Sequence, residues 1–66
     1  MQLTLNGRPH PLLEGTALSG LVAALAPDSR GIAVAVNGQV VRAADWPTTT
    51  LGEGDDVEIV TAHQGG

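Results

Sequence analysis

Two Asn-Gly dipeptides constrain the fold of this chain more than any other feature of its sequence. Asn6-Gly7 and Asn37-Gly38 each separate two short runs of strand-forming residues. Both central residues of a type I′ turn need positive φ, and Asn followed by Gly meets that need at a low steric cost. The sequence therefore predicts two tight β-hairpins.

The strands of these hairpins follow from the apolar pattern. Residues 2–6 alternate polar and apolar, which is typical of a half-buried strand, and residues 32–36 are apolar on both faces, which predicts an interior strand. Residues 9–13 contain two prolines and favour an edge strand, because proline cannot donate to a ladder. Residues 39–42 complete the second hairpin, and a last strand is predicted over residues 57–62.

A helix is predicted between the hairpins. Its apolar stripe has the i, i+3, i+4, i+7 spacing and consists of Leu18, Leu21, Val22 and Leu25. Thr16 is the predicted N-cap, and Pro27 ends the helix after Ala26. A single helical turn is also predicted over Asp45–Pro47, where Trp46 is expected to fill a gap at the edge of the core.

The order of hairpin, helix, hairpin and strand indicates the fold class. The helix must cover one sheet face, and the last strand pairs most economically beside the first, parallel to it. This is an α+β, ubiquitin-like β-grasp fold, a mixed five-stranded sheet with one main helix packed on one face. A ferredoxin-like layout stays open at this point, because it needs only a second helix. Residues 1–62 form the predicted domain, and residues 63–66 form a flexible tail.

The composition excludes several classes of activity. The chain has no cysteine, which removes thiolate nucleophiles, redox chemistry and sulfur-ligated zinc. Its net charge of −4 repels nucleic acids and anionic membrane surfaces. It shows no secretory signal and no transmembrane segment, so we expect a cytoplasmic protein. A 66-residue body is too small to enclose an ordinary active-site pocket, so we expect neither an enzyme nor a bound cofactor or metal.

The terminal Gly65-Gly66 is the feature that most suggests chemistry. Glycine has no Cβ, so such a tail can enter a narrow enzyme channel. Attack of the Gly66 carboxylate on the α-phosphorus of ATP would give an acyl adenylate, which a sulfur nucleophile can displace to leave a thiocarboxylate. The partner enzyme would supply ATP, magnesium and the base.

The sequence resembles the ThiS family, the sulfur carriers of thiamine biosynthesis. The segments that carry the resemblance are Met1–Gly7, Gly15–Leu18 with Leu21 and Leu25, Ala33–Gly38, Leu51–Val60, Ala62 and Gly65-Gly66. The resemblance implies a β-grasp fold and adenylation of Gly66 by a ThiF-type adenylyltransferase. It also implies conversion to a thiocarboxylate with sulfur from a donating enzyme, and delivery of that sulfur to the thiazole synthase ThiG. Gly65 is then the residue next to Gly66 that, because it has no side chain, lets the tail enter the narrow channel of the enzyme.

Related carriers share this fold and terminus. The chain is therefore also compatible with a carrier for molybdopterin, cysteine or tRNA thiolation, with a ubiquitin-like protein modifier, or with an interaction module that has an inert tail.

A second candidate site lies on the sheet face away from the helix. By the period-two rule this face carries Thr4, Ala33, Ala35, Glu58, Val60 and Ala62. We expect a flat docking patch there. His63 and Gln64 follow this face in the sequence and belong to the tail that is expected to enter the enzyme channel. The alternative is that the alanines only keep a central strand slim.

Four acidic residues precede the tail, namely Glu53, Asp55, Asp56 and Glu58. They could steer the tail toward a basic enzyme. In the alternative interpretation, they form a solvated turn in which Asp55 caps local amides.

Overall fold

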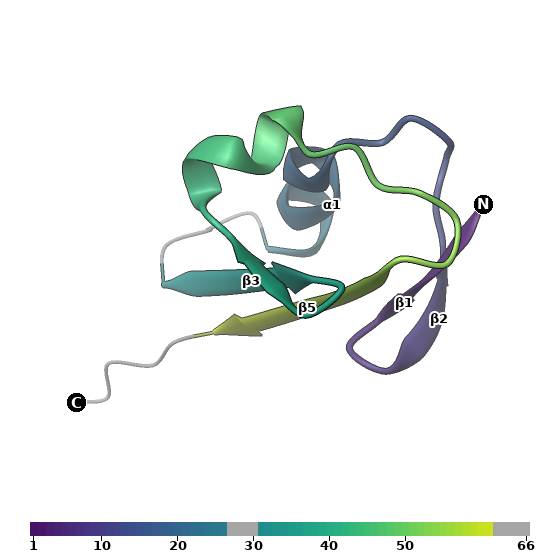
Figure 1. Cartoon of the computed structure of the whole chain (residues 1–66), viewed down its shortest axis with the longest axis horizontal. Helices are drawn as coiled ribbons and strands as arrows, with labels where there is room; N and C mark the ends of the chain where they lie inside the picture. The colour runs from purple at the N-terminus through teal and green to yellow at the C-terminus, as the bar shows by residue number, and fades with distance from the viewer. Residues whose placement is uncertain (27–30, 62–66) are drawn as a thin grey trace.

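The computed structural model describes residues 1–26 and 31–61, which form a mixed sheet with a helix on one face (Figure 1). The elements follow the predicted succession of hairpin, helix, hairpin and final strand, with a 3-10 helix, η1, before the last strand. They are β1 (Gln2–Leu5), β2 (Arg8–Pro11), α1 (Leu18–Leu25), β3 (Ile32–Val36), β4 (Gln39–Val41), η1 (Ala43–Thr48) and β5 (Asp56–Thr61).

Both Asn-Gly dipeptides form the predicted tight turns. Asn6 and Gly7 have φ of 50° and 82°, and Asn37 and Gly38 have φ of 52° and 84°. Positive φ at both central residues is the signature of a type I′ turn, whose twist matches that of the flanking strands. The two hairpins predicted from the sequence are therefore confirmed.

The first turn also sets where β2 begins. Because the turn contains two residues, Leu5 pairs directly with Arg8, and β2 starts one residue earlier than predicted. It ends at Pro11, two residues before the predicted end. The edge position predicted from its prolines is confirmed, since β2 is the first strand in the sheet order β2-β1-β5-β3-β4.

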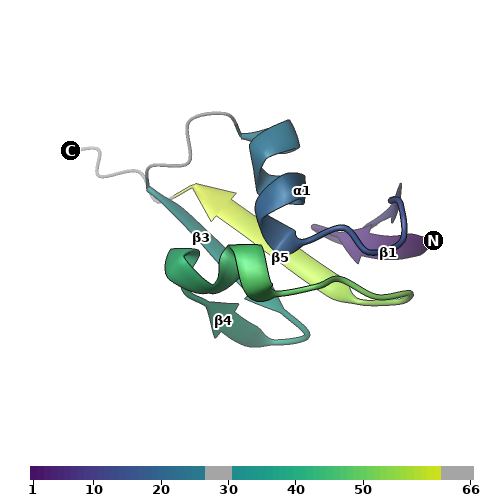
Figure 2. The same cartoon turned by 90° about the horizontal axis from the view of Figure 1, so that it is seen from above.

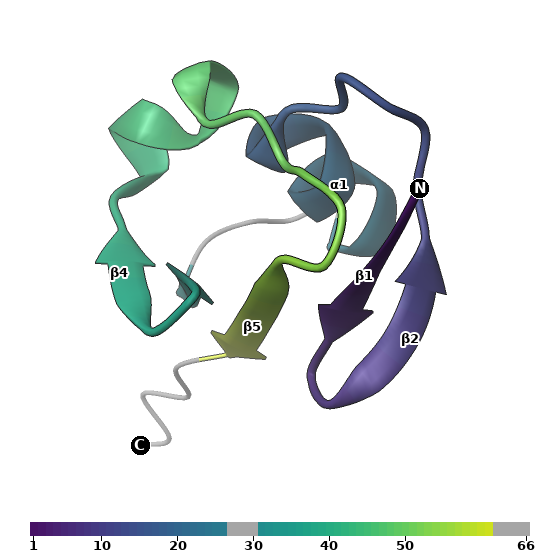
Figure 3. The same ribbon diagram turned by 45° about the vertical axis from the view of Figure 1, so that its right-hand side comes forward.

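β5 occupies the centre of the sheet. It runs parallel to β1 and antiparallel to β3, so the last strand lies beside the first as predicted. α1 and η1 contact each other and lie on the same side of the sheet (Figures 1 and 3). Viewed from that side, α1 projects onto the central strand (Figure 2). This is the predicted β-grasp arrangement and not the ferredoxin-like alternative.

The core lies between the sheet and α1. Its buried side chains are Leu3, Leu18, Leu21, Val22, Val34, Trp46, Leu51 and Val57. The predicted helical stripe supplies three of them, but Leu25 is 46% exposed. The reason is that α1 ends at Leu25, so no further helical turn shields its side chain.

The N-terminus of α1 differs from the prediction. Ala17, not Thr16, occupies the N-cap position, and no side chain caps the helix. The Thr16 hydroxyl instead donates to the carbonyl oxygen of Leu13 at 2.6 Å. The first helical amide, that of Leu18, donates to the carbonyl oxygen of Thr49 at 2.7 Å. Backbone from a distant segment thus takes the capping role.

Trp46 is confirmed as a core residue. It lies in η1, which is longer than the single turn predicted over Asp45–Pro47. Its side chain is 7% exposed, and its indole Nε1 donates to the carbonyl oxygen of Val41 at 3.0 Å. A buried indole N–H needs such a partner, so this bond fixes the ring against the end of β4.

Within residues 1–26 and 31–61, no helix has the length and apolar character needed to cross a membrane.

Candidate docking face and carrier tail

The predicted site has two parts, a tail and a docking face. His63, Gln64, Gly65 and Gly66, together with Ala62, lie outside the described residues, so their roles stay predictions. The last described residue before them is Thr61, at the end of β5. The docking face lies almost wholly within the described residues.

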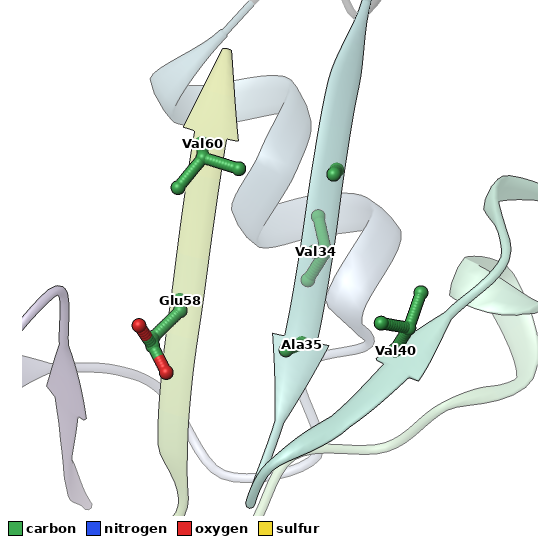
Figure 4. A pocket seen from close by; sticks show the side chains of 6 residues that line it. Val34, Ala35, Val40, Glu58 and Val60 are labelled. Atoms are coloured by element: carbon green, nitrogen blue, oxygen red, sulfur yellow. The ribbon is translucent and has the colours of Figure 1, made fainter. Parts of the chain in front are cut away.

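The sheet register gathers part of this face into one depression. β3 pairs with β5 so that Ala33 lies opposite Val60 and Ala35 opposite Glu58. β3 also pairs with β4 so that Ala35 lies opposite Val40. Directly paired residues project to the same side of a sheet. These five residues line a shallow depression of about 170 Å³, and Val34 also borders it, although its side chain lies on the opposite face of β3 (Figure 4).

Small side chains in the middle and larger ones at the sides give the depression its shape. Ala33 and Ala35 on β3 form the floor, because each ends at Cβ. Val40 and Val60 stand on the flanking strands and are 78% and 55% exposed. Two exposed valines on either side of a small-residue floor form an apolar patch that a partner surface can cover.

The structure brings together only some of the predicted docking residues. Ala35, Glu58 and Val60 line the depression, as does Ala33. Thr4 shares their face, but it pairs with Asp56 at the start of β5 and does not line the depression.

Sequence reasoning missed Val40. The signal was present, since a two-residue turn at Asn37-Gly38 sets Val40 opposite Ala35. A register derived from turn length would have placed it on the docking face.

The four acidic residues divide into two pairs. Asp55 Oδ2 accepts from the amide of Gly52 at 2.7 Å, and Asp55 Oδ1 accepts from the Asn37 side chain at 3.1 Å. Glu53 Oε1 accepts from the amide of Gln2 at 3.0 Å. The interpretation of Asp55 as a local cap is therefore confirmed, and Glu53 also helps to hold the turn.

The other acidic pair, Asp56 and Glu58, is exposed on β5. Both follow the same alternation as Val60, so both lie on the docking face. A partner that covers this face should present basic groups toward them. In the described part of the chain, no three His, Asp or Glu side chains are grouped so that they could hold a metal ion.

Comparison with curated proteins gives two related matches. The chain is 37% identical over 62 residues to the sulfur carrier protein ThiS of Thermus thermophilus, covering 94% of this chain and 95% of that one. It is also 36% identical over all of its 66 residues to a thiazole synthase of Magnetococcus marinus. That alignment spans 20% of the longer protein.

Solved structures agree with this result. A crystal structure of the thiamine biosynthesis protein ThiS from Geobacter metallireducens superposes with a TM-score of 0.86 at 32% identity, covering all of both chains. A solution NMR structure of a thiamine biosynthesis protein from the same organism gives a TM-score of 0.81, also at 32% identity, and covers 88% of that chain. The model of the ThiS family matches residues 3–66. By sequence and by fold, this chain belongs to the ThiS family.

Proposed function

We propose that this protein is the sulfur carrier for the thiazole of thiamine and that the Gly66 carboxylate is its carrier group. The observation that carries the proposal is the family match over residues 3–66, which includes Gly65-Gly66 as well as the globular domain. The relative called sulfur carrier protein ThiS aligns over nearly the same length, which supports the same assignment.

The chemistry needs no catalytic side chain from this chain. A Gly66 carboxylate oxygen attacks the α-phosphorus of ATP and displaces pyrophosphate, giving an acyl adenylate. Hydrosulfide delivered by a donating enzyme then attacks the acyl carbon, forms the C–S bond and displaces AMP, and loss of the S–H proton leaves a thiocarboxylate. The chain is a co-substrate in these steps, and partner enzymes supply catalysis and bind ATP. The transfer is expected in the cytoplasm.

The docking face is the proposed contact for a ThiF-type adenylyltransferase. Val40 and Val60 offer apolar area that is already exposed, so covering it removes apolar surface from water. Glu58 lies on the rim of the depression and favours a partner with a basic group opposite it. Val60 is on the last strand, so the contact residues lie close in sequence to the tail that the enzyme must adenylate.

A thiazole synthase of the ThiG type is the proposed sulfur acceptor. The support is the match to the thiazole synthase of Magnetococcus marinus, in which a segment similar to this whole chain forms part of the same polypeptide. This observation favours the thiamine pathway over carriers for molybdopterin, cysteine or tRNA thiolation.

Intact mass spectrometry of a reconstituted reaction tests the proposal. The chain, a ThiF-type enzyme, ATP and a sulfur donor should yield a species in which one sulfur has replaced one oxygen. A variant with an alanine appended after Gly66 should yield none. Its matched control carries the same alanine between His63 and Gln64, so it has the same mass but still ends in Gly65-Gly66, and it should react.

Undiminished sulfur loading of the extended chain, without removal of its added alanine, would refute the carrier role of Gly66. Covalent adducts with larger proteins in the native host would instead support a protein modifier.

A further inference from the structure

β5 extends beyond the strand that flanks it on one side. The β1–β5 pairing contains only Thr4 with Asp56 and Leu5 with Val57. β1 then turns away into the first hairpin, whereas β5 continues to Thr61 (Figure 1). Among the described residues, no strand therefore pairs with the second half of β5 on its β1 side.

The side chain of Asn6 takes the place of the missing strand. The backbone amide of Asn6 donates to the carbonyl oxygen of Val57 at 2.9 Å. Its side-chain Oδ1 accepts from the amide of Ile59 at 2.8 Å, and its Nδ2 donates to the carbonyl oxygen of Ile59 at 3.2 Å. A carboxamide has the donor and acceptor of a peptide group, so Asn6 adds one rung to the parallel ladder.

Asn37 provides a natural comparison. It occupies the same position of the other Asn-Gly turn with nearly the same φ, 52° against 50° for Asn6. Its Oδ1 accepts from the amide of Asp56 at 2.9 Å, and its Nδ2 donates to Asp55 Oδ1 at 3.1 Å. Asn37 thus holds the start of β5 from the β3 side, whereas Asn6 holds the middle of β5 from the β1 side.

We propose that Asn6 is a positioning residue for sulfur transfer, because it fixes the half of β5 that leads to the carrier tail. The residue it holds, Ile59, immediately precedes Val60 of the docking face, and residues 62–66 follow in the sequence. Holding both the amide and the carbonyl group of Ile59 sets the direction of the strand end and lowers the entropy lost when a partner captures face and tail together. The inference rests on the proposed function, but the hydrogen bonds themselves do not.

Amide hydrogen exchange measured by NMR tests whether the Asn6 side chain protects the Ile59 amide. Asn6→Gly keeps a residue that tolerates positive φ and removes only the side chain, and Asn37→Gly is its matched control. Asn6→Gly should speed exchange of the Ile59 amide about tenfold. The amides of Glu58 and Val60 face β3 and should keep their protection, because successive strand residues direct their backbone groups to opposite sides. Equal acceleration of all three would indicate only lower global stability.

Adenylation kinetics test whether the hydrogen bonds between Asn6 and Ile59 assist the reaction with the partner enzyme. With a purified ThiF-type enzyme and ATP, pyrophosphate release should show a KM for Asn6→Gly raised about fivefold with little change in kcat. Asn37→Gly should keep the wild-type KM. Asn6→Asp keeps the acceptor for the Ile59 amide but loses the donor, so its KM should lie between those of wild type and Asn6→Gly.

Two results would overturn the inference. One is an Ile59 exchange rate in Asn6→Gly that is unchanged or rises no more than the rates of Glu58 and Val60, and the other is a KM for Asn6→Gly no higher than that for Asn37→Gly. Failure of the proposed function looks different, because then no adenylation of the wild-type chain occurs while Ile59 exchange still responds to Asn6→Gly.

Discussion

The two faces of the sheet are built from the same strands, and both carry valines, but these valines are buried on one face and exposed on the other. On the helix side, Val34 and Val57 are 2% and 0% exposed and belong to the core. On the docking face, Val40 and Val60 remain 78% and 55% exposed, with alanines between them. Because side chains alternate along a strand, substitutions a few residues apart should separate stability from partner binding.

The largest effect should come from a charge placed on the helix side. Val57→Glu puts a carboxylate at a fully buried position with no partner, which should lower the free energy of unfolding by about 5 kcal/mol or more. In so small a domain we expect loss of the folded state, measured as the absence of a cooperative thermal transition by circular dichroism. A cooperative transition near the wild-type midpoint would contradict the assignment of Val57 to the core.

A truncation on the helix side should have the next largest effect. Trp46→Ala should lower the free energy of unfolding by about 3 kcal/mol, because it removes the ring and leaves a cavity between η1 and the sheet. Trp46→Phe is the control, since it keeps most of the volume but loses the bond to Val41, and it should cost about 1 kcal/mol. Urea denaturation followed by circular dichroism measures both, and equal losses would contradict a packing role.

The same type of charge on the docking face should leave the fold intact. Val60→Glu is expected to melt within a few degrees of wild type, because the side chain is already half exposed. It should lower kcat/KM for adenylation by a ThiF-type enzyme about thirtyfold, the effect of losing an interface hot spot. Pyrophosphate release measures this loss. Unchanged adenylation would remove the face from the proposed contact.

A smaller effect is expected at Val40, the docking-face residue that sequence reasoning missed. Val40→Ala should lower kcat/KM for adenylation about fivefold, because it removes one side of the depression without adding charge. Gln39→Ala, at the neighbouring exposed position, is the matched control and should leave kcat/KM unchanged. Similar losses in the two variants would place the contact outside the depression.

Much of the fold was predictable because its signals are local. The Asn-Gly turns and the apolar runs act within a few residues, and both hairpins, the helix and the interior strand formed as predicted. Three details departed from the prediction or escaped it. Thr16 lost the capping role to a distant carbonyl oxygen, Leu25 became exposed where α1 ends, and Val40 was overlooked although the two-residue turn sets its register.

The candidate site divides in the same way. Gly66 and the outward alternation of Glu58 and Val60 were readable from the chain, since a terminus and a period of two need no knowledge of contacts. The shape of the depression was not readable, because it depends on how β3, β4 and β5 align.

The sequence by itself determined where the chain turns, which residues alternate and which residues end it, since these follow from backbone preferences and the order of side chains. Only the tertiary structure decided that the side chains of Asn6 and Asn37 hydrogen-bond to the backbone of β5, and that Val40 and Val60 flank the same alanines. These contacts join residues far apart in the sequence, and they exist only after the two hairpins have packed on the central strand.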